Sequence, residues 1–267
     1  MTKPRISIVT PCLNAATTIG RTLDSVRSQG YPDLQHLVID GGSTDGTLAL
    51  LAKHDDLVVV SERDEGLSDA LNKGLALADG DIIGWLNADD LYRPGALDAV
   101  AAAFLRAPTA GWITGHCGII GADDEPIRPF VTRYKSFFLR HYSYRLLLTQ
   151  NFVSAPATFL TRRGFTIASP ANLEYRYSMD YDLWLRVGRA GRPTIVDQEL
   201  AAFRMIDGTL SMTGFERQFR EHAEIARLHA RGAGDRVAAL VNRLLSVGIV
   251  TTYHAMGQVR RRSAAEA

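Results

Sequence analysis

The sequence predicts an α/β protein in which helices flank a mostly parallel β-sheet, with a helical extension at the C-terminus. Three observations indicate this fold. Along the first 110 residues, short apolar runs alternate with segments of helical periodicity. Glycine-rich and acidic turns separate them. After residue 212 the chain is rich in Arg and Ala and shows a helical pattern. Strands that alternate with helices of this length form βαβ units, whose strands are parallel.

The first half of the chain supplies the parallel strands. Apolar runs predict strands at residues 6–9, 37–39, 57–60 and 82–86. Apolar residues three or four apart predict the intervening helices, which contain Ile19, Leu23 and Val26; Leu48 and Leu51 behind a capping Ser43 or Thr44; Leu67, Leu71 and Leu75; and, after Pro94, Leu97, Val100 and Phe104.

The second half follows a looser pattern. Short strands are expected at 112–114, 117–120, 157–160, 194–196 and 201–204, and a helix at 181–187. Residues 130–148 are aromatic and basic and show no regular period, so we expect an irregular segment there. No internal repeat is evident.

The composition excludes several classes of protein. The chain has 267 residues, 46% of them hydrophobic, which suffices for one sizeable core. Because 30 Lys and Arg balance 29 Asp and Glu, the basic surface of a nucleic-acid-binding protein is absent. Two distant cysteines, Cys12 and Cys117, indicate neither a disulfide framework nor a metal site. No apolar stretch approaches the roughly 20 residues of a membrane-spanning helix, and the N-terminus has no signal-peptide pattern, so we expect a cytoplasmic protein.

Carboxylates directly follow two of the predicted strands. Asp40 follows the second strand, and Asn87, Asp89 and Asp90 follow the fourth. Ligands of open α/β sheets bind at the carboxyl ends of the strands. Two acidic clusters repel a bare diphosphate but hold one through a divalent cation, and Mg²⁺ takes one or two protein carboxylates beside phosphate oxygens. Asp89 fits as that ligand and Asp90 as a second ligand or a sugar contact. The alternatives are a tight turn at Asp40 and a helix-capping acid pair.

Four more polar residues are candidates for a site. Asn72 and Lys73 lie on the third predicted helix, within reach of a phosphate or sugar hydroxyl, although Lys73 also suits the surface. Asp180 begins a helix, where a fixed carboxylate acts either as a general base or as an N-cap. Arg204 ends the last strand and suits either a bidentate phosphate contact or a structural ion pair. The chain lacks the glycine motifs of dinucleotide and P-loop sites and the serine elbow of hydrolases.

Taken together, five ordered stretches resemble the family 2 glycosyltransferases, which have the GT-A fold. The resemblance covers residues 5 to 212 and is carried by residues 6–15 (ISIVTPCLNA), 38–47 (VIDGGSTDGT), 66–74 (GLSDALNKG), 84–90 (GWLNADD) and 179–184 (MDYDLW). It implies a GT-A domain at 1–212, with a nucleotide half to about residue 110 and an acceptor half at 111–212, followed by a helical extension at 213–267.

The resemblance also implies an activity. It implies inverting transfer of a sugar from a nucleotide-diphosphate donor, with UDP-sugars favoured by family frequency, to a saccharide or lipid-linked acceptor of the cell envelope. Asp89 would bind Mg²⁺ or Mn²⁺ with Asn87 and Asp90 beside it, and Asp180 would take the proton of the acceptor hydroxyl. The donor site would include Pro11, Asn14, Asp40, Asp64, Asp69, Asn72, Lys73 and Arg204.

The sequence departs from the family pattern at several points. Asn87 replaces the first acid of the DxD metal motif, and Ile206 stands where a histidine often follows the strand-end arginine. The histidine that supplies a third protein metal ligand in many relatives is therefore missing, and we expect metal binding to be loose. Leu71 stands where many relatives have an arginine, which removes one phosphate contact.

Two segments have compositions that suit contact with a membrane or with the acceptor. Residues 130–148 suit a lid, an acceptor platform, a membrane contact or an amphipathic helix over the sheet edge. The tail combines Leu244 and its apolar neighbours with Arg260, Arg261 and Arg262, which indicates a helical hairpin with a solvated basic end or peripheral attachment to anionic lipid at the inner face of the cell membrane.

Two other functions remain open at this point. A sugar-nucleotide nucleotidyltransferase also uses an α/β fold and Mg²⁺-binding Asp, but it usually carries a basic glycine-rich loop after the first strand, where this chain has PCLNAA at 11–16. A non-catalytic nucleotide- or sugar-binding module is the third possibility.

Overall fold

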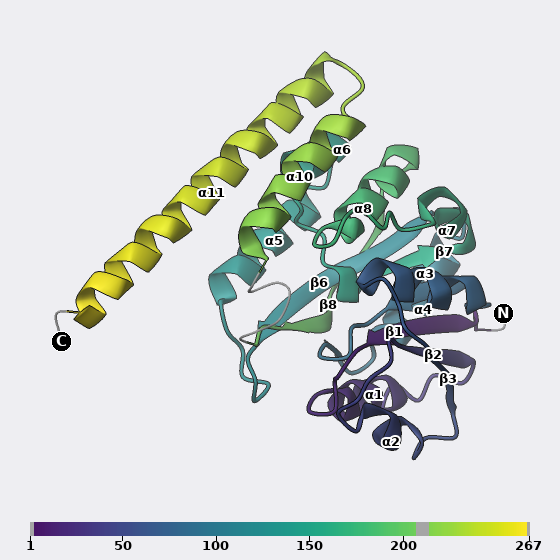
Figure 1. Ribbon diagram of the computed structural model, residues 1–267. Coiled ribbons are helices and arrows are strands. Elements are labelled where there is room, and N and C mark those ends of the chain that lie inside the picture. Colours follow the sequence, from purple (N-terminus) through teal and green to yellow (C-terminus); the bar gives the residue numbers. More distant parts are fainter. Residues whose placement is uncertain (1–2, 207–213, 266–267) are drawn as a thin grey trace.

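One mixed β-sheet organises the molecule. Figure 1 shows the computed structural model, which describes residues 3–206 and 214–265, with side chains described to residue 252. In the described residues eight strands pair in the order β3-β2-β1-β4-β7-β6-β8-β5. Their bounds are β1 Ile6–Cys12, β2 Leu34–Asp40, β3 Leu57–Ser61, β4 Ile82–Trp85, β5 Leu91–Tyr92, β6 Trp112–Ile120, β7 Thr158–Thr161 and β8 Thr194–Arg204.

Helices cover both faces of this sheet and extend beyond it (Figure 1). A 3₁₀ turn, η1, precedes β7 at Ala155–Ala157. The helices are α1 Ile19–Arg27, α2 Thr47–Leu51, α3 Leu67–Leu77, α4 Ala96–Arg106, α5 Pro129–Arg140, α6 Tyr144–Thr149, α7 Arg162–Ala168, α8 Met179–Ala190, α10 Phe215–His229 and α11 Ala233–Ala265.

The strands β3, β2, β1 and β4 are mutually parallel, as predicted. In the paired register Cys12 lies opposite Asp40, which lies opposite Ser61. The carboxyl ends of these strands therefore meet at one edge of the sheet, and the loops that carry the predicted donor residues leave from that edge.

The second half of the sheet is mixed. β7 runs antiparallel to β4 and β6, and β8 runs parallel to β6. The two strands predicted at 112–114 and 117–120 are one strand, β6, and those predicted at 194–196 and 201–204 are one strand, β8. A register shift around His116 interrupts their pairing, and such an irregularity breaks the alternation from which strands are predicted.

Residues 130–148 were expected to be irregular, with an amphipathic helix as an alternative, and they form the two helices α5 and α6. Proline at the first turn of α5 and the side chain of Ser143 at the start of α6 mark the two helix starts. The irregular impression arises because aromatic residues lie on more than one face of α5: Phe130 and Phe137 are exposed, while Phe138 packs against the core.

Side chains of the central strands alternate between two cores. Ile83 and Trp85 pack in a cluster with residues of α3 and α8, whereas Ile82 and Leu86 pack with residues of α4 on the other face. The sheet is thus buried on both sides, which explains the near-continuous apolar runs of its parallel strands.

Three buried tryptophans join separate parts of the chain. Trp184 of α8 stacks on Trp85 of β4, with ring centroids 5.1 Å apart, and on Trp112 of β6 at 5.9 Å. Stacked aromatic pairs contribute about 0.5–1.5 kcal/mol beyond their buried area. The stack anchors the first turns of α8 to the strand that precedes the acidic motif.

The helices α10 and α11 form the predicted helical hairpin (Figure 1). Asn242 of α11 donates from Nδ2 to the carbonyl of Leu148 at 3.1 Å and to the hydroxyl of Tyr181 at 3.2 Å, which ties α11 to α6 and α8. The predicted domain boundary at 212/213 and the side chains of Arg260, Arg261 and Arg262 lie outside the described residues. No helix within 3–206 and 214–265 combines the length and the apolar character needed to cross a bilayer.

Both cysteines are buried and form no disulfide, in agreement with the sequence analysis. Burial raises the pKa of the Cys12 thiol to about 12, and the Asp40 carboxylate beside it acts in the same direction. Burial likewise raises the pKa of Cys117 to about 12.

The contact between α3 and the parallel strands depends on Gly74. A Cβ atom there would lie 2.3 Å from Cγ1 of Val9 and 3.0 Å from Cγ1 of Ile39. We predict that Gly74→Ala destabilises the fold by about 1–3 kcal/mol through overpacking. Gly20→Ala in α1 is the control, because no atom lies within 4 Å of the added methyl group and helix propensity favours Ala by up to about 1 kcal/mol. Urea unfolding measures both, and an unchanged midpoint for Gly74→Ala would contradict the packing argument.

Candidate active site

Asp40 ends β2 and is fully buried. Its carboxylate accepts hydrogen bonds from the backbone amides of Gly42 at 3.1 Å and Ser43 at 3.1 Å, and from Oγ of Ser61 at 2.7 Å. Burial opposes ionisation, but these hydrogen bonds outweigh it and lower the pKa of Asp40. Asp40 is therefore an anion that shapes the turn after β2, which was the alternative to its role as a donor contact.

Asp64 and Asn14 lie next to this turn. A Cβ at Gly41 would come 2.4 Å from Oδ2 of Asp64, so the absence of a side chain at 41 makes room for this carboxylate. Asn14 accepts at Oδ1 from the amide of Thr44 at 2.9 Å and thereby joins the loops after β1 and β2. Pro11 is buried within β1. The structure thus brings together the predicted donor residues of the first two loops.

The predicted ligand-binding residues of α3, Asn72 and Lys73, both have partners within the protein. Asn72 donates from Nδ2 to the carbonyl of Ala171 at 2.9 Å and accepts from the amide of Ala171 at 2.8 Å. Its amide group holds α3 to the segment before α8, and its contact with a phosphate or sugar hydroxyl stays a prediction. Lys73 forms ion pairs with Glu62 at 2.9 Å and Asp69 at 3.3 Å, which connects the start of α3 to the loop after β3.

Asp90 is wholly buried and acts within the protein. Its Oδ1 accepts from the amide of Arg204 at 2.9 Å, and its Oδ2 accepts from Nδ2 of Asn87 at 3.2 Å. Burial and the neighbouring charge of Asp89 raise its pKa well above the ordinary value. Both oxygens of Asp90 thus accept from protein groups, and its contact with metal or sugar stays a prediction.

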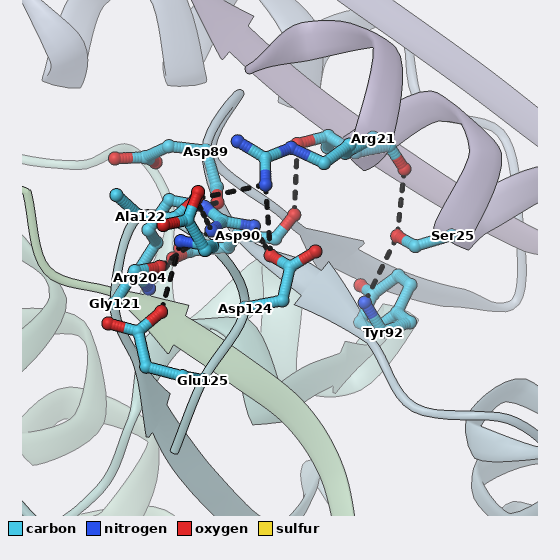
Figure 2. A network of polar contacts seen from close by, with 12 residues as sticks. Arg21, Ser25, Asp89, Asp90, Tyr92, Gly121, Ala122, Asp124, Glu125 and Arg204 are labelled. Atoms are coloured by element: carbon cyan, nitrogen blue, oxygen red, sulfur yellow. Dashed lines mark hydrogen bonds and ion pairs between the residues drawn. The ribbon is translucent and has the colours of Figure 1, made fainter. Parts of the chain in front are cut away.

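Arg204 is also structural. It is 1% exposed, donates from Nε to the carbonyl of Asp89 at 2.7 Å and from Nη1 to the carbonyl of Gly121 at 2.7 Å, and pairs through Nη2 with Asp124 (Figure 2). The structure shows the structural ion pair, which was the alternative to the phosphate contact, and the phosphate contact stays a prediction. Arg204 holds the backbone of the acidic motif against the loop after β6.

Asp89 and Asn87 offer oxygen atoms to a ligand: the Asp89 carboxylate accepts from its own backbone amide, and no side chain of the described residues hydrogen-bonds to it. Asp89 is half-buried, burial raises its pKa, and Figure 2 shows its carboxylate pointing away from the Arg204 network. The Oδ1 of Asn87 is buried and accepts no hydrogen bond from the described residues. Two hard oxygen donors thus remain at the end of β4, the type that Mg²⁺ and Mn²⁺ take. In the described part of the chain, no cluster of three or more His, Cys, Asp or Glu side chains is arranged to hold a metal.

Asp180 occupies the first turn of α8 and lines a cleft of about 1530 Å³. Its Oδ1 accepts from the amide of Tyr181 at 2.7 Å, and Nδ2 of Asn151 donates to its Oδ2 at 3.3 Å. Burial raises the pKa of Asp180, while the positive charge of Lys135 acts in the opposite direction. Asp180 is thus a fixed carboxylate with access to a large cleft.

The cleft joins some of the predicted residues but not all. Asn87 and Asp180 both line it, together with Trp85, Lys135 and Asn151. Its described lining does not include the predicted donor residues Asp40, Asp64 and Asp89. Of the three residues expected to share one pocket, 40, 89 and 180, only Asp180 lines this cleft, and the acidic motif reaches it through Asn87. Asp40 and Asp64 lie farther along the same edge of the sheet.

Sequence reasoning missed Asn151 as a site residue. It lies between α6 and η1, outside any periodic segment, so the sequence offers only the signal of a polar residue before the buried Phe152 and Val153. Lys135 was noticed only as one of several cations among the aromatic residues of 130–148. Its place in the cleft follows from the helical form of α5.

Comparison with known proteins agrees with this geometry. The model of glycosyl transferase family 2 matches residues 7–167. A Bacillus subtilis protein named as a teichuronic acid biosynthesis glycosyltransferase, TuaG, is 25% identical over 85% of this chain and 90% of its own length. A PGL/p-HBAD biosynthesis glycosyltransferase of Mycobacterium bovis is 33% identical over 70% of both chains.

Solved structures share the fold. The chain superposes on S. aureus TarS 1-349 in complex with UDP-GlcNAc with a TM-score of 0.66 and 16% identity, over 91% of this chain and 72% of the other. It spans 43% of a longer S. aureus TarS chain. The mannosyltransferase PcManGT of Pyrobaculum calidifontis, in complex with GDP-Man and Mn²⁺, gives 0.66 and 19% over 99% of this chain and 81% of the other. With a family model that matches more than half of its length, and with this fold, the chain belongs to glycosyl transferase family 2.

Proposed function

We propose that this protein transfers a sugar from a nucleotide-diphosphate donor, with a UDP-sugar as the favoured one, to a hydroxyl of a saccharide or lipid-linked acceptor, with inversion at the anomeric carbon. The observation that carries the proposal is that Asn87 of the acidic motif and the fixed carboxylate of Asp180 line one cleft. The names of the relatives in teichuronic acid and PGL/p-HBAD biosynthesis support a role in cell-envelope polysaccharide or glycolipid synthesis, and the UDP-GlcNAc bound by TarS supports a uridine donor.

The proposed reaction assigns the base to Asp180. Its two hydrogen bonds, from Tyr181 and Asn151, fix the carboxylate at the start of α8, where it accepts the proton of an acceptor hydroxyl in the cleft. Attack from this side, opposite the leaving diphosphate, inverts the anomeric carbon. Positioned proton transfer is typically worth about 10²–10⁴-fold in rate.

We propose that Asp89 and Asn87 hold a divalent cation, Mg²⁺ or Mn²⁺. The unused oxygens of these two side chains fit such an ion, and the Mn²⁺ in the PcManGT complex supports the choice. When bound, the cation offsets the charge that develops on the departing diphosphate. With a single protein carboxylate in place, most of its coordination falls to water and to the donor.

We predict that Asp180→Asn keeps nucleotide binding but loses turnover by on the order of 10²-fold or more, because the amide cannot take a proton. Release of nucleoside diphosphate from a panel of nucleotide sugars measures turnover, and titration calorimetry measures binding. Asp24→Asn on the exposed face of α1 is the matched control. Near-normal turnover in Asp180→Asn would remove Asp180 from the role of base.

The pH dependence offers a second prediction for the same carboxylate. Only its ionised form accepts a proton, so kcat/KM falls as the pH drops through the pKa of Asp180. Because burial raises that pKa, we expect the acidic limb of the profile above the ordinary value of 3.8. A limb at or below 3.8, measured from nucleoside diphosphate release in a mixed buffer, would contradict this environment for the base.

We predict that Asp89→Ala weakens UDP binding in Mn²⁺ on the order of tenfold or more, because the sole carboxylate ligand of the cation is lost. Binding in the presence of a chelator should not differ between the two proteins, which separates metal loss from misfolding. Equal affinities of wild type and variant for UDP in Mn²⁺ would overturn the metal assignment.

We also propose a peripheral contact with an anionic membrane surface through α11, at the inner face of the cell membrane. The buried side of this helix mixes the core residues Ala238 and Ala239 with the polar Asp235, Asn242 and Ser246. On its outer side, Leu240 and Leu244 are 54% and 64% exposed. From residue 236 to 262 the sequence contains five arginines and no acid. A second copy of this helix would bring like charges together, whereas an anionic bilayer receives both the apolar stripe and the arginines.

We predict that the protein sediments with vesicles that contain phosphatidylglycerol and not with vesicles of phosphatidylcholine alone. Leu240→Ser and Leu244→Ser should each weaken this partitioning by about tenfold, because they remove apolar surface from the inserted face. The control is Leu105→Ser on α4, where a similarly exposed leucine lies far from α11 in the fold. Loss of a dimer rather than of vesicle binding in these variants, seen by analytical ultracentrifugation, would show that a second copy covers the stripe.

A further inference from the structure

The acceptor side of the cleft is lined by cations without carboxylate partners. Arg128, Lys135, Arg176 and Arg217 all line it, and in the described parts of the chain none of them forms an ion pair. The acids in the same lining are Asp180, the proposed base, and Glu216. Among the described residues of the lining, these four cations therefore outnumber the two acids.

Lys135 is the most informative of these cations because it lies deepest. Its side chain is half-buried, and burial lowers its pKa. Its ammonium donates to Oγ of Ser154 at 3.2 Å, and among the described residues its other two N–H donors have no hydrogen-bond acceptor. The Asp180 carboxylate acts on this ammonium through its charge, but in the described parts of the chain no carboxylate lies within ion-pair distance of it. A poorly hydrated ammonium that lacks a contacting carboxylate is stabilised when an anion binds beside it.

Other shielded cations of the protein differ from Lys135 in this respect. Arg204 pairs with Asp124, Arg186 with Asp182, and Arg189 with Asp235 at 3.2 Å. In each case a carboxylate touches the guanidinium. Lys135 faces the cleft instead of such a partner, as expected for a group that awaits a ligand.

Asn151 supplies a hydrogen-bond acceptor to the same cleft, in contrast to the donors of Lys135. Its Nδ2 donates to Asp180, while its Oδ1 is buried and accepts no hydrogen bond from the described residues. A sugar hydroxyl that approaches Asp180 would donate to this oxygen. The cleft thus holds a base, an acceptor for a neighbouring hydroxyl and, on α5, a cation.

We propose that the acceptor carries an anionic group, a phosphate or a carboxylate, beside the hydroxyl that reacts, and that Lys135 binds this group. The three arginines at the rim attract such an acceptor and hold any further charges along it. This inference rests on the proposed function, since it concerns the acceptor side of the same cleft. It is distinct from donor binding, which is assigned to the oxygens of Asn87 and Asp89 and to the loops after β1 and β2.

The test separates acceptor binding from donor binding. The full chain is saturated with UDP and Mn²⁺, so that the diphosphate position is filled, and is titrated calorimetrically with glucuronate, glucose 6-phosphate and neutral glucose. We expect one or both charged sugars to bind about tenfold or more tightly than glucose, with an affinity that falls as salt is added. The comparison of the two charged sugars distinguishes carboxylate from phosphate.

Variants assign the effect to Lys135. Lys135→Met should abolish the preference for charged sugars, and Lys135→Arg should retain most of it. Arg133→Met is the matched control, because Arg133 is an exposed cation of the same helix outside the cleft lining. UDP affinity should stay within about twofold in all three variants.

Three results would overturn the proposal: equal affinity for charged and neutral sugars, an unchanged preference in Lys135→Met, or anion binding that occurs only without UDP and disappears when UDP is added. The last result would assign Lys135 to the donor diphosphate. Failure of the proposed function is a different outcome, since it is read from the absence of UDP binding and of nucleoside diphosphate release. The anion titration of the free protein still decides whether Lys135 binds an anion in that case.

Discussion

The stack of Trp85, Trp184 and Trp112 sets the geometry on which the site depends. Trp85 ends β4 two residues before Asn87, and Trp184 lies one helical turn after Asp180. Their rings are parallel within 8° and fully buried, so the acidic motif and the proposed base are held by the same rigid contact. A reaction that uses two groups from distant parts of a chain needs such a contact, since small displacements of the reacting groups lower the rate strongly.

A second constraint acts on the acidic motif from behind. Arg204 and Asp90 are both buried, and together they fasten the backbone of residues 87–90 to β8 and to the loop after β6. This arrangement gives two adjacent aspartates different tasks. The carboxylate of Asp90 hydrogen-bonds to Arg204 and Asn87, whereas the carboxylate of Asp89 points away from this network and is available to a ligand. The sequence does not distinguish Asp89 from Asp90 by residue type or spacing. They differ because β8 packs on the side of the motif to which Asp90 points.

The parallel half of the sheet was predictable because each of its strands is short, apolar and followed by a helix with a clear period. Asp40, Asp64 and the acidic motif were placed correctly at one edge on that basis. The second half was predicted less well. Residues 130–148 form two helices whose period is hard to detect because aromatic residues lie on several of their faces. The register shift at His116 made two continuous strands look like four short ones in the sequence.

The same reasoning explains which structural contacts the sequence did not predict. Asn72 and Arg204 were assigned to ligand because their side chains can bind phosphate or sugar hydroxyls. Their partners in the fold lie far away in the chain: Ala171 is 99 residues from Asn72, and Asp124 is 80 residues from Arg204. A single sequence contains no record of such long-range pairings. Asn151 is the reverse case. No local sequence pattern identifies it as a site residue, and it contacts Asp180 only in the folded chain.

The burial of both thiols has a practical consequence. At neutral pH neither Cys12 nor Cys117 offers the thiolate that maleimides and iodoacetamides attack, since the pKa of each is raised to about 12. A cysteine introduced on the outer side of α11 would therefore react almost alone. A fluorophore placed there would report, in an otherwise native protein, on the polarity of whatever approaches that helix.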